Sequence, residues 1–469
     1  MRIIVIGGGI TGLSAAHRLV ELCAKKKLPL ELSVLEASDR IGGVIATRHN
    51  SEFLIEEGPD SFITNKPWAI ELCRRLGLDS QIIHTNDENR RTYVVHEGRL
   101  VPLPDGFFMM APSRFMPFLT SPLFSWRGKL RMLLDLFMPR AGQLDDESLA
   151  SFVIRRLGRE ALERVAQPMI SGIYTADPEK LSLRATMPRF LEMEEQHGSL
   201  IRAMLSEQKF EKQLNKAESG ARYSLFVSLK NGMQSLIDTL AARLPEGSVK
   251  LNHTMKSLES TDRGWNLITD KKIEVHADSV IITIPSYSAA KLVEGLDPSL
   301  AEDLSKIEYA SSTVVNLAYK TEDISHSLYG FGFVTPMIEK RPLIACSFSS
   351  VKFAGRAPEG FALLRCFVGG AIQPEILEFD DSKLIETSHR ELVSLLEIKD
   401  QPVFATVHRY PKSMPQYHVG HLDLVAKINY KAGRHKGLVI AGNAYGGVGI
   451  ADCVHSGERA AEAVLEAIR

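Results

Sequence analysis

The first residues that could do chemistry are four closely spaced glycines near the start of the chain. Gly7, Gly8, Gly9 and Gly12 follow a short apolar run at residues 3–6. A missing Cβ allows a tight turn at the first glycine, close approach of a diphosphate at the third, and close packing of a helix on a strand at the last. Unpaired N–H groups at the start of the next helix would bind the phosphates. The spacing therefore predicts a site for the diphosphate of a nucleotide.

The elements around these glycines support this interpretation. Residues 3–6 are apolar and β-branched, as in a strand buried on both faces of a parallel sheet. Ile10 and Thr11 open a segment whose apolar residues recur at helical spacing. A second strand is predicted at residues 30–35, and it leads into Glu36. This acid follows the last glycine at the distance expected of a residue that accepts hydrogen bonds from ribose hydroxyls.

The next residues resemble one group of flavoproteins. Residues 36–43 (EASDRIGG) are similar to the E-A-x-x-R-x-G-G extension of glutathione-reductase-type FAD proteins, in particular the amine-oxidase-like branch. The resemblance implies a second clasp on the phosphates, which NAD dehydrogenases lack. Residues 57–62 (EGPDSF) resemble the loop of this family that passes close to the flavin. The FAD contacts implied by these two stretches are Ala37, Arg40, Gly42, Gly43, Val44, Gly58, Pro59, Asp60 and Ser61.

Later stretches extend the resemblance. Residues 250–258 stand where the family has a strand that contacts adenine, with Met255 at the contact position; ordinary sheet packing is the alternative for Met255. Residues 277–285 (ADSVIITIP) match an apolar family strand stopped by proline. Residues 437–442 predict a further strand, and a final helix is expected to end near residue 467. The turn between them faces the flavin in the family, which adds Asn443, Val448, Gly449 and Ile450 to the implied contacts.

These pieces predict an α/β chain, α+β overall, with a discontinuous glutathione-reductase-type Rossmann-like FAD domain. The length of 469 residues is that of two or three packed units. The expected boundaries are residues 1–75, 220–300 and 425–469 for the FAD-binding domain, 76–104 and 301–424 for an inserted mixed-sheet substrate-binding domain, and 105–219 for a helical subdomain.

Two segments near the helical subdomain have distinctive patterns. Residues 125–138 (SWRGKLRMLLDLFM) mix three basic residues with leucine, phenylalanine and methionine. A helix lying on a membrane surface is one interpretation. We favour a core helix with solvated charges, because helices of globular proteins are amphipathic in the same way. The polar residues 208–222 predict a mobile connection.

Three stretches resemble the porphyrinogen oxidases, the flavoproteins that make protoporphyrin or coproporphyrin. Residues 167–182 (QPMISGIYTADPEKLS) resemble P-x-x-S-G-I-Y-A-G-D-x-x-x-L-S, and residues 413–421 (SMPQYHVGH) resemble P-Q-Y-x-x-G-H. Residues 442–457 resemble G-A-S-x-x-G-V-G-I-x-D-C-I-x-x-G. Amine oxidases share the first and last family motifs but lack the middle two. The resemblance is strongest to the soluble coproporphyrinogen III oxidases.

This resemblance implies an oxygen-dependent oxidation that removes six electrons from coproporphyrinogen III, one hydride at a time, with H2O2 as the second product. Because the flavin would carry the chemistry, no catalytic side chain is assigned. His418 and His421 are expected to be turn histidines satisfied by backbone rather than bases. Amine oxidases commonly attach the flavin to a cysteine near the C-terminal motif. Cys453 lies beyond the flavin-facing turn, so we expect non-covalent FAD.

The four propionates of coproporphyrinogen require cations or N–H donors at the rim of the pocket. Lys66 is the first candidate, since related soluble enzymes have a lysine at the matching position; a solvated surface lysine is the alternative. Tyr174 is the second, as an aromatic wall or hydrogen-bond donor, with plain packing as a close competitor. Mitochondrial and plant protoporphyrinogen oxidases have an arginine shortly after a proline-rich turn. Residues 103–109 contain none, which favours a wider, differently charged pocket.

Composition limits other functions. A net charge of −1 argues against nucleic acid as a partner. The five cysteines are scattered without a C-x-x-C pair, so we expect buried thiols and neither disulfides nor a metal site. No signal peptide or apolar span is recognised, which predicts a cytoplasmic protein, with peripheral membrane contact left open. The expected partners are the porphyrinogen, O2 and the next enzyme of the haem pathway, to which product would be transferred.

Three other functions stay open. A protoporphyrinogen IX oxidase would differ only in its preferred substrate. A flavin amine oxidase would be reduced by amines. A non-catalytic binding module of the GDP-dissociation-inhibitor kind has degraded glycine motifs, and the intact glycines of this chain argue against it.

Overall fold

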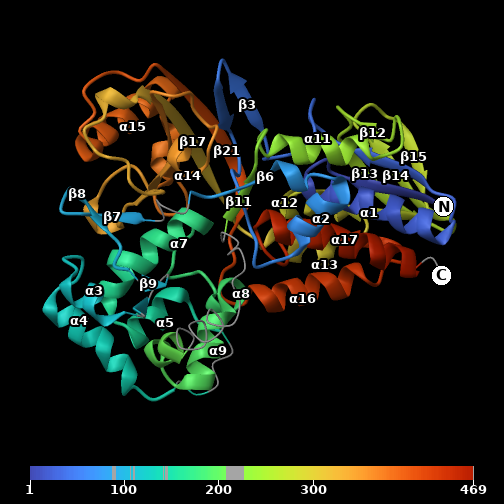
Figure 1. The fold of residues 1–469 in the computed structure, drawn as a ribbon. Helices are drawn as coiled ribbons and strands as arrows, with labels where there is room; N and C mark the ends of the chain where they lie inside the picture. Colours follow the sequence, from blue (N-terminus) through green and yellow to red (C-terminus); the bar gives the residue numbers. More distant parts are fainter. Residues whose placement is uncertain are drawn as a thin grey trace. The chain divides into compact units, whose positions relative to one another are not determined.

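A computed structural model gives the structure of the chain (Figure 1). It describes residues 1–86, 91–105, 107–108, 111–112, 114–140, 142, 146–206 and 226–467. The chain folds into two compact units, each assembled from separate segments. The first unit comprises Met1–His84, Ser224–Tyr309 and His421–Arg469, and the second comprises Thr85–Tyr223 and Ala310–Gly420. The division of roles into FAD-binding, substrate-binding and helical parts stays a prediction.

The first unit is built on a five-stranded parallel sheet. Segments from the start, middle and end of the chain alternate in it, so the strands expected near residues 3–6, 30–35, 277–285 and 437–442 are confirmed. The strand expected from residue 277 begins two residues later, because residues 274–277 belong to another sheet. The order is β12 (Val249–Lys250), β2 (Glu31–Leu35), β1 (Arg2–Ile6), β16 (Ser279–Ile282) and β22 (Leu438–Ile440).

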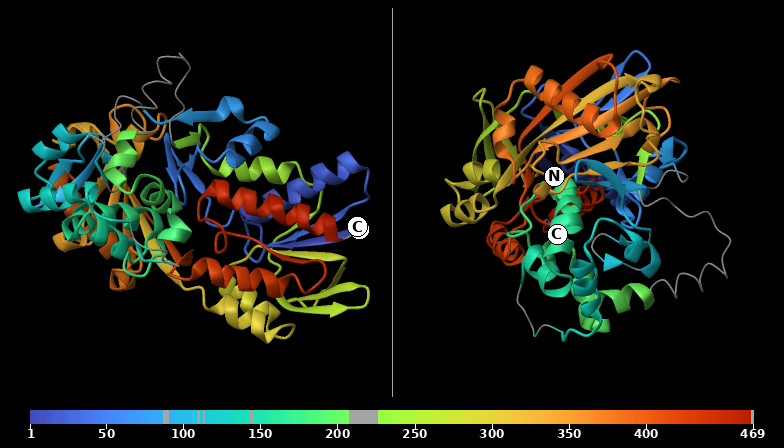
Figure 2. Two further views of the ribbon diagram at one scale, coloured as in Figure 1. Left: turned by 90° about the horizontal axis from the view of Figure 1, so that it is seen from below. Right: turned by 90° about the vertical axis from the view of Figure 1, so that its left-hand side faces the viewer.

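Strand β1 supports a core on each face of this sheet. Ile3 and Val5 belong to one apolar cluster, and Ile4 and Ile6 belong to another, because alternate side chains of a strand point to opposite faces. Helices α1 and α17 lie side by side in the first cluster (Figure 2). The first cluster contains α1 (Ile10–Lys26), α2 (Trp68–Leu76), α11 (Gln234–Ala242) and α17 (Ile450–Ala467), and the second contains α12 (Ser286–Val293), α13 (Pro298–Ser305), α16 (His421–Ala432) and the sheet β13 (Met255–Thr261), β14 (Gly264–Thr269) and β15 (Glu274–Ala277).

The second unit contains the expected mixed sheet. Strands β18 and β7 are parallel, whereas the pairs β7–β8, β18–β19, β19–β20 and β17–β20 are antiparallel. Leucines of α15 (Asp381–Leu396) belong to its apolar cluster. The strand order is β21 (Phe404–Pro415), β17 (Tyr309–Lys320), β20 (Phe361–Gly369), β19 (Ala345–Phe348), β18 (Gly332–Val334), β7 (Thr92–His96) and β8 (Arg99–Pro102).

The rest of the second unit is mainly helical. A π-helical turn at Leu162–Ala166 precedes α7. The expected mobile connection at residues 208–222 lies outside the described residues, as do residues 106 and 109 of the proline-containing turn. The helices described in this part include α3 (Phe115–Thr120), α4 (Trp126–Leu133), α5 (Leu149–Arg156), α6 (Arg159–Ala161), α7 (Gln167–Tyr174), α8 (Leu183–Thr186), α9 (Pro188–His197) and α14 (Ser349–Lys352).

Helix α4 differs from the expected core helix with solvated charges. Lys129 is buried and donates a hydrogen bond to the carbonyl oxygen of Leu119 at 2.7 Å. Arg131 donates to the last carbonyl groups of α5, those of residues 154–156. The last carbonyls of a helix lack intrahelical donors, so the guanidinium caps this end of α5; Gly158 N also donates to the carbonyl oxygen of Ile154 at 3.1 Å. The expectation of solvated charges is therefore wrong for Lys129 and Arg131, whereas Arg127 is exposed as expected. Trp126, expected in the core, is exposed.

Three chain-wide features bear on function. Among the described residues, no helix combines the length and apolarity needed to cross a membrane. All five cysteines are buried, as expected, and free. Burial raises the pKa of the Cys73 and Cys453 thiols to about 12. Within the described ranges, no three His, Cys, Asp or Glu side chains are grouped as metal ligands would be.

Candidate functional site

The glycine turn between β1 and α1 needs its glycines for two different reasons. Gly7 has a φ of +109°, and a Cβ there would lie 2.7 Å from Thr283 Oγ1. A Cβ at Gly12 would lie 1.9 Å from the carbonyl oxygen of Gly7, so packing excludes a side chain at both positions. Gly9 has an ordinary φ of −75°, and a Cβ there would meet nothing within 4 Å in the described structure. Gly9 thus leaves an open stretch of backbone rather than a tight contact.

The start of α1 has the chemistry that an anion requires. Gly9 caps the helix without a side-chain hydrogen bond, and no acidic residue lies in the first turn. The N–H groups of Ile10, Thr11 and Gly12 have no acceptor within the helix, and they form its positive end. These residues fit the diphosphate of a dinucleotide.

Glu36, directly after β2, lies beside the glycine turn. Its Oε2 accepts a hydrogen bond from Gly8 N at 2.6 Å, and its Oε1 accepts from the N and Oγ of Ser38, both at 2.8 Å. The backbone N–H of Glu36 donates to Lys250 O, in β12, and its carbonyl oxygen accepts from His253 N, in the loop that follows, both at 2.9 Å. A carboxylate has about four acceptor positions, so capacity remains for a ribose hydroxyl. The ribose contact stays a prediction.

The second predicted phosphate-binding segment, residues 36–43, lies against the glycine turn. Gly42 N donates to Gly8 O at 2.8 Å, and Gly9 and Gly42 form a parallel bridge. Gly42 and Gly43 both have positive φ, +106° and +60°. Arg40 holds this loop by donating to the carbonyl oxygens of residues 41, 43 and 45. Ala37 and Arg40 are exposed, and their contacts to FAD stay predictions.

The loop at residues 57–62 packs on the end of this second phosphate-binding segment, at Val44. A Cβ at Gly58 would lie 1.7 Å from the carbonyl oxygen of Val44, so the two segments meet backbone to backbone. After Pro59, Ser61 Oγ donates to Asp60 Oδ1 at 2.7 Å. Ser228 of β11 (Phe226–Leu229) donates to the carbonyl oxygen of Asp60 at 2.6 Å. The structure therefore brings the first three predicted FAD segments together in one unit.

The turn before α17 is shaped around Asp452. A Cβ at Gly447, whose φ is +142°, would lie 2.3 Å from Asp452 Cγ, and one at Gly449 would lie 3.2 Å from Asp452 Oδ2. Lys66 Nζ lies 2.7 and 2.8 Å from the two carboxylate oxygens of Asp452. Lys66 is thus ion-paired, unlike the solvated lysine of the alternative interpretation. Asn443, Val448 and Ile450 lie in the same turn or at the start of α17.

Met255 lies apart from the parallel sheet. It is the first residue of β13, is partly buried and packs against the apolar cluster that contains Leu258. Packing accounts for its position, and its contact with adenine stays a prediction.

The two middle motifs of the porphyrinogen oxidase resemblance lie side by side in the second unit. Ser182 N donates to the carbonyl oxygen of Tyr417 at 2.8 Å, and Val419 N donates to that of Lys180 at 2.9 Å. These bonds flank an antiparallel bridge between residues 181 and 418. Segments more than 200 residues apart in the sequence therefore form one local structure.

Asp146 accepts hydrogen bonds from both motifs. This residue was not identified from the sequence. Ser182 Oγ donates to its two carboxylate oxygens at 2.9 and 2.8 Å, and Gly420 N donates to Oδ2 at 2.9 Å. An acid shortly before a helix is common, and nothing in its sequence neighbourhood indicates partners so far along the chain.

Tyr174 ends α7 in the second unit. Its hydroxyl lies 3.4 Å from the carbonyl oxygen of Thr186, and its own carbonyl oxygen lies 3.4 Å from Nε2 of the buried Gln416. Lys66 belongs to the first unit. The two substrate candidates therefore come from different compact units, and their roles stay predictions.

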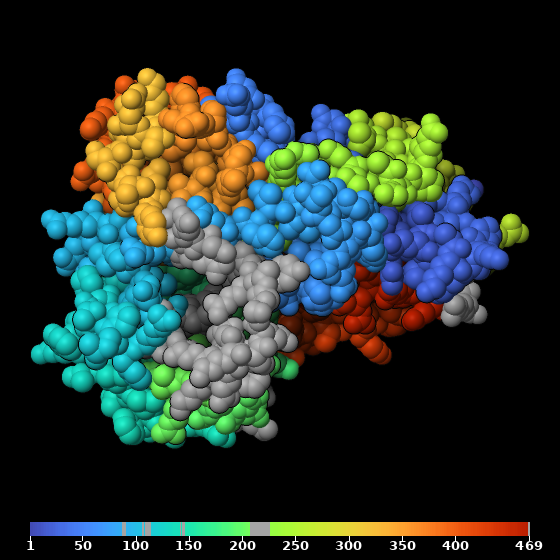
Figure 3. Space-filling model, in the orientation of Figure 1, coloured from blue at the N-terminus to red at the C-terminus, as the bar shows by residue number. Residues whose placement is uncertain are grey.

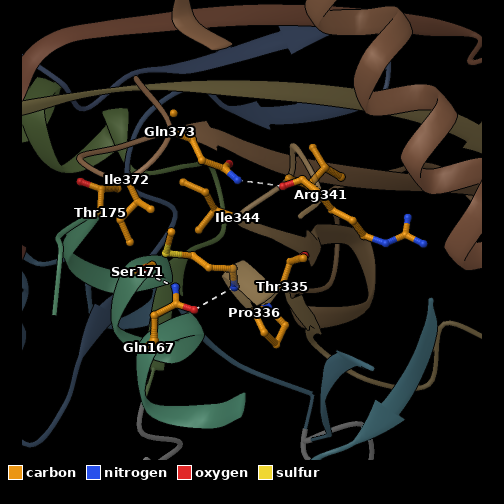
Figure 4. A pocket seen from close by; sticks show the side chains of 12 residues that line it. Gln167, Ser171, Thr175, Thr335, Pro336, Arg341, Ile344, Ile372 and Gln373 are labelled. Atoms are coloured by element: carbon orange, nitrogen blue, oxygen red, sulfur yellow. Dashed lines mark hydrogen bonds between the residues drawn. The ribbon is translucent and has the colours of Figure 1, made fainter. Parts of the chain in front are cut away.

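A small cavity of about 20 Å³ lies beside α7 (Figure 4). Gln167 closes one side, because its Oε1 accepts from Met337 N at 2.9 Å while its Nε2 donates to Ser171 Oγ at 3.0 Å. Gln373 Nε2 donates to the carbonyl oxygen of Arg341 at 2.9 Å on another side. This volume holds about one water molecule, so the cavity is not a place for a macrocycle.

Comparison with known proteins shows the family. Residues 10–465 match the flavin-containing amine oxidoreductase family, and the chain belongs to it. The chain is 34% identical to a coproporphyrinogen III oxidase of Bacillus subtilis (strain 168), over 99% of this chain and 97% of the relative. It is 32% identical to the chloroplastic protoporphyrinogen oxidase 1 of Spinacia oleracea, over 98% of this chain and 84% of the relative.

A solved structure agrees with this assignment. The crystal structure of an Exiguobacterium sp. 255-15 protein, provisionally assigned as a protoporphyrinogen oxidase, superposes with a TM-score of 0.86 at 29% identity, covering 99% of both chains. The chain therefore has the amine-oxidase-like FAD fold, with its parallel sheet and its mixed sheet. A flavin-containing family implies FAD, which the cradle around Gly9 and α1 fits.

Proposed function

We propose that this chain is an FAD-dependent coproporphyrinogen III oxidase of haem biosynthesis that acts in the cytoplasm. The observation that carries the proposal is the 34% identity to the Bacillus subtilis coproporphyrinogen III oxidase over nearly the whole of both chains. In the proposed reaction, coproporphyrinogen III and three O2 give coproporphyrin III and three H2O2, so six electrons and six protons leave the macrocycle.

The cofactor would be held by the residues brought together in the first unit. The N–H groups at the start of α1 and the open backbone at Gly9 bind the diphosphate, and Glu36 binds the ribose. Residues 42–44 and 58–61 line the cofactor from the other side, and residues 443–450 face the ring. Bound there, the flavin would supply hydride acceptance and electron transfer to O2.

Non-covalent attachment is part of the proposal. Burial raises the pKa of the Cys453 thiol to about 12, so almost no thiolate forms at neutral pH. The thiolate is the nucleophile in cysteine chemistry, and Cys453 is therefore a poor point of attachment for the flavin.

Substrate carboxylates would be bound by Lys66, with Tyr174 as a wall or donor. An ammonium group has three N–H donors. Lys66 approaches the two oxygens of Asp452, and its ammonium can also turn a donor toward a propionate. We place Lys66 beside one of the two propionates that protoporphyrinogen IX lacks, so the cation would favour the tetracarboxylate.

Anaerobic mixing tests the function. Purified holoenzyme is mixed with coproporphyrinogen III, protoporphyrinogen IX or an amine, and flavin absorbance is followed before air is admitted. We expect bleaching by coproporphyrinogen III, then porphyrin fluorescence and H2O2 in air, with the higher kcat/KM for this substrate. A higher kcat/KM for protoporphyrinogen IX would favour the alternative that the 32% identity to the spinach protein supports. Bleaching by amines alone would identify an amine oxidase.

A further inference from the structure

Two of the five cysteines face each other across neighbouring strands of the second unit. Cys346 of β19 lies opposite Cys366 of β20 in the antiparallel register, and both thiols are free. The other three cysteines, Cys23, Cys73 and Cys453, belong to the first unit. The second unit therefore has its two cysteines side by side. The segment that carries them takes the orange colours of Figure 3.

The hydrogen bonds of β19 show which kind of cross-strand pair the cysteines form. Phe348 N donates to the carbonyl oxygen of Phe331 at 2.9 Å, toward β18. Backbone groups alternate in direction along an antiparallel strand, so Cys346, two residues earlier, also directs its backbone toward β18, where Phe333 is its partner. Cys346 and Cys366 are therefore a pair without hydrogen bonds between them. In such pairs the Cα atoms lie about 4.5 Å apart and the side chains are closest.

The two thiols are buried and close enough to be joined. Cys346 is 2% exposed and Cys366 is 0% exposed, in the apolar cluster that contains leucines of α15. Burial and, after it, the neighbouring Cys346 thiol raise the pKa of Cys366 well above its usual range. A disulfide joins Cα atoms that are about 4.4–6.8 Å apart, so a bond between these sulfurs requires little movement of the strands.

Both strands also contact α7, which carries part of the motif at residues 167–182. A Cβ at Gly172 would lie 4.0 Å from Cβ of Ala345, the residue before Cys346. Ala371 N, just after β20, donates to the carbonyl oxygen of Thr175 at 2.8 Å. A lone thiol that is oxidised beyond the sulfenic acid becomes an anion, and an apolar core does not solvate an anion. Such damage would therefore reach the strands that support α7.

We propose that Cys346 and Cys366 are a reversible oxidation site, at which hydrogen peroxide converts the two thiols into a disulfide between β19 and β20. The disulfide captures the first oxidation product before an anion forms in the core. Hydrogen peroxide is small, as access to buried thiols requires. It is also the second product of the proposed reaction, but the inference does not depend on that reaction.

The chemistry balances in two steps. The sulfur of Cys346 bonds to one peroxide oxygen as the O–O bond breaks, which gives a sulfenic acid and water. The sulfur of Cys366 then displaces hydroxide from this sulfur, which forms the S–S bond and, with the thiol proton, a second water. The two sulfurs together lose two electrons, and the peroxide gains them. Cys346 reacts first because the thiolate is the nucleophile and the raised pKa of Cys366 keeps that thiol protonated.

Peptide mapping tests the proposal with the folded holoprotein. The protein is treated with hydrogen peroxide, the peroxide is removed with catalase, and free thiols are blocked before digestion with trypsin without reduction. We expect residues 341–352 joined to residues 366–383, and separate peptides after dithiothreitol. The oxidised protein should keep its circular dichroism and unfold about 5 °C higher than the reduced one, because a cross-link restricts the unfolded chain.

Single variants separate the pair from ordinary buried thiols. In Cys366→Ala, Cys346 should proceed to sulfinic or sulfonic acid that dithiothreitol does not reverse, and the unfolding temperature should fall. In Cys346→Ala, Cys366 should be oxidised at least about tenfold more slowly than Cys346 is in Cys366→Ala, since each pKa unit changes the thiolate fraction about tenfold. Cys73→Ala, which removes a lone buried cysteine on α2, is the matched control and should form the disulfide as the unaltered protein does. Circular dichroism before treatment checks that each variant is folded.

Three results would overturn the proposal. One is a folded protein in which peroxide joins no cysteines, or joins them only after urea has unfolded the chain. Another is a disulfide of Cys346 or Cys366 with a different cysteine. The third is sulfinic acid at Cys346 in the unaltered protein at the rate found in Cys366→Ala, because the second thiol would then capture nothing.

Discussion

Lys66 forms an ion pair with both carboxylate oxygens of Asp452, a residue 386 positions later in the chain. The pair ties the loop before α2 to the first turn of α17. Asp452 in turn occupies the space left open by the absent side chains of Gly447 and Gly449. Lys66, the predicted substrate contact, therefore also stabilises the turn before α17 that is expected to face the flavin.

Replacing Lys66 should affect both roles. Lys66→Ala should lower the free energy of unfolding by about 0.5–1 kcal/mol, a small value because the Lys66 side chain is 39% exposed. It should also raise KM for coproporphyrinogen III more than for protoporphyrinogen IX. Urea unfolding and steady-state kinetics with both substrates measure the two effects.

A double variant separates them. Lys66→Ala with Asp452→Asn removes the unpaired carboxylate, so stability should recover. If Lys66 binds a propionate, KM for the tetracarboxylate stays raised in the double variant. Equal changes of KM for both substrates would remove Lys66 from the substrate-binding residues.

Gly9→Val should yield a folded protein without FAD. The backbone at Gly9 has an ordinary φ, and no described atom lies within 4 Å of its Cβ position, so folding tolerates the side chain. The valine would instead occupy the place of the diphosphate. Flavin fluorescence during titration of the apoprotein measures binding. Gly295→Val, at another open position, is the control and should bind FAD normally; tight flavin retention by Gly9→Val would contradict the site.

Asp146→Ala should destabilise the second unit. Ser182 Oγ and Gly420 N would lose the acceptor that joins the two middle motifs, and an unsatisfied polar group costs about 1–3 kcal/mol. Urea unfolding measures the loss. Asp262→Ala, at an exposed acid, should change stability by less than about 0.5 kcal/mol. A loss for Asp146→Ala as small as that of the control would show that the connection contributes nothing.

Acid should weaken the contact between α13 and α16. Hydrogen bonds from Lys306 and Lys431 hold the pKa of Asp303 below its usual range. Because the folded pKa is the lower one, this contribution is present above the unfolded pKa of about 3.9 and is lost as pH falls from there through the folded pKa. Asp303→Asn should therefore be less stable than the unaltered protein at pH 7, and the difference should vanish in strong acid. A difference independent of pH would contradict the assignment.

Flavin should leave the protein on denaturation, and native Cys453 should not react with thiol reagents. The thiol is buried and its pKa is raised to about 12, and reactivity requires the thiolate. Acid precipitation should release all flavin absorbance into the supernatant. A disulfide reagent should react with the cysteines only after the protein is unfolded. Flavin that remains with the precipitate would show covalent attachment.

The sequence by itself determined the glycine turn, the acid beside it and most of the elements that carry them. Gly7, Gly12 and Glu36 were recognisable because their requirements are local: a tight turn, a close helix and an acid just beyond the next strand. The apolar runs indicated their strands for the same reason, since burial on both faces of a sheet requires uninterrupted apolar residues.

Only the tertiary structure decided what each polar side chain meets. Asp452 for Lys66, and Ser182 and Gly420 for Asp146, come from distant segments that chain folding brings together. The periodicity of residues 125–138 likewise indicated an amphipathic helix but not which face turns inward. In the folded chain the inward face of this helix carries Lys129, which donates to the carbonyl oxygen of Leu119, and Arg131 donates to carbonyl oxygens at the end of α5; these acceptors lie in other segments and were not visible in the periodicity.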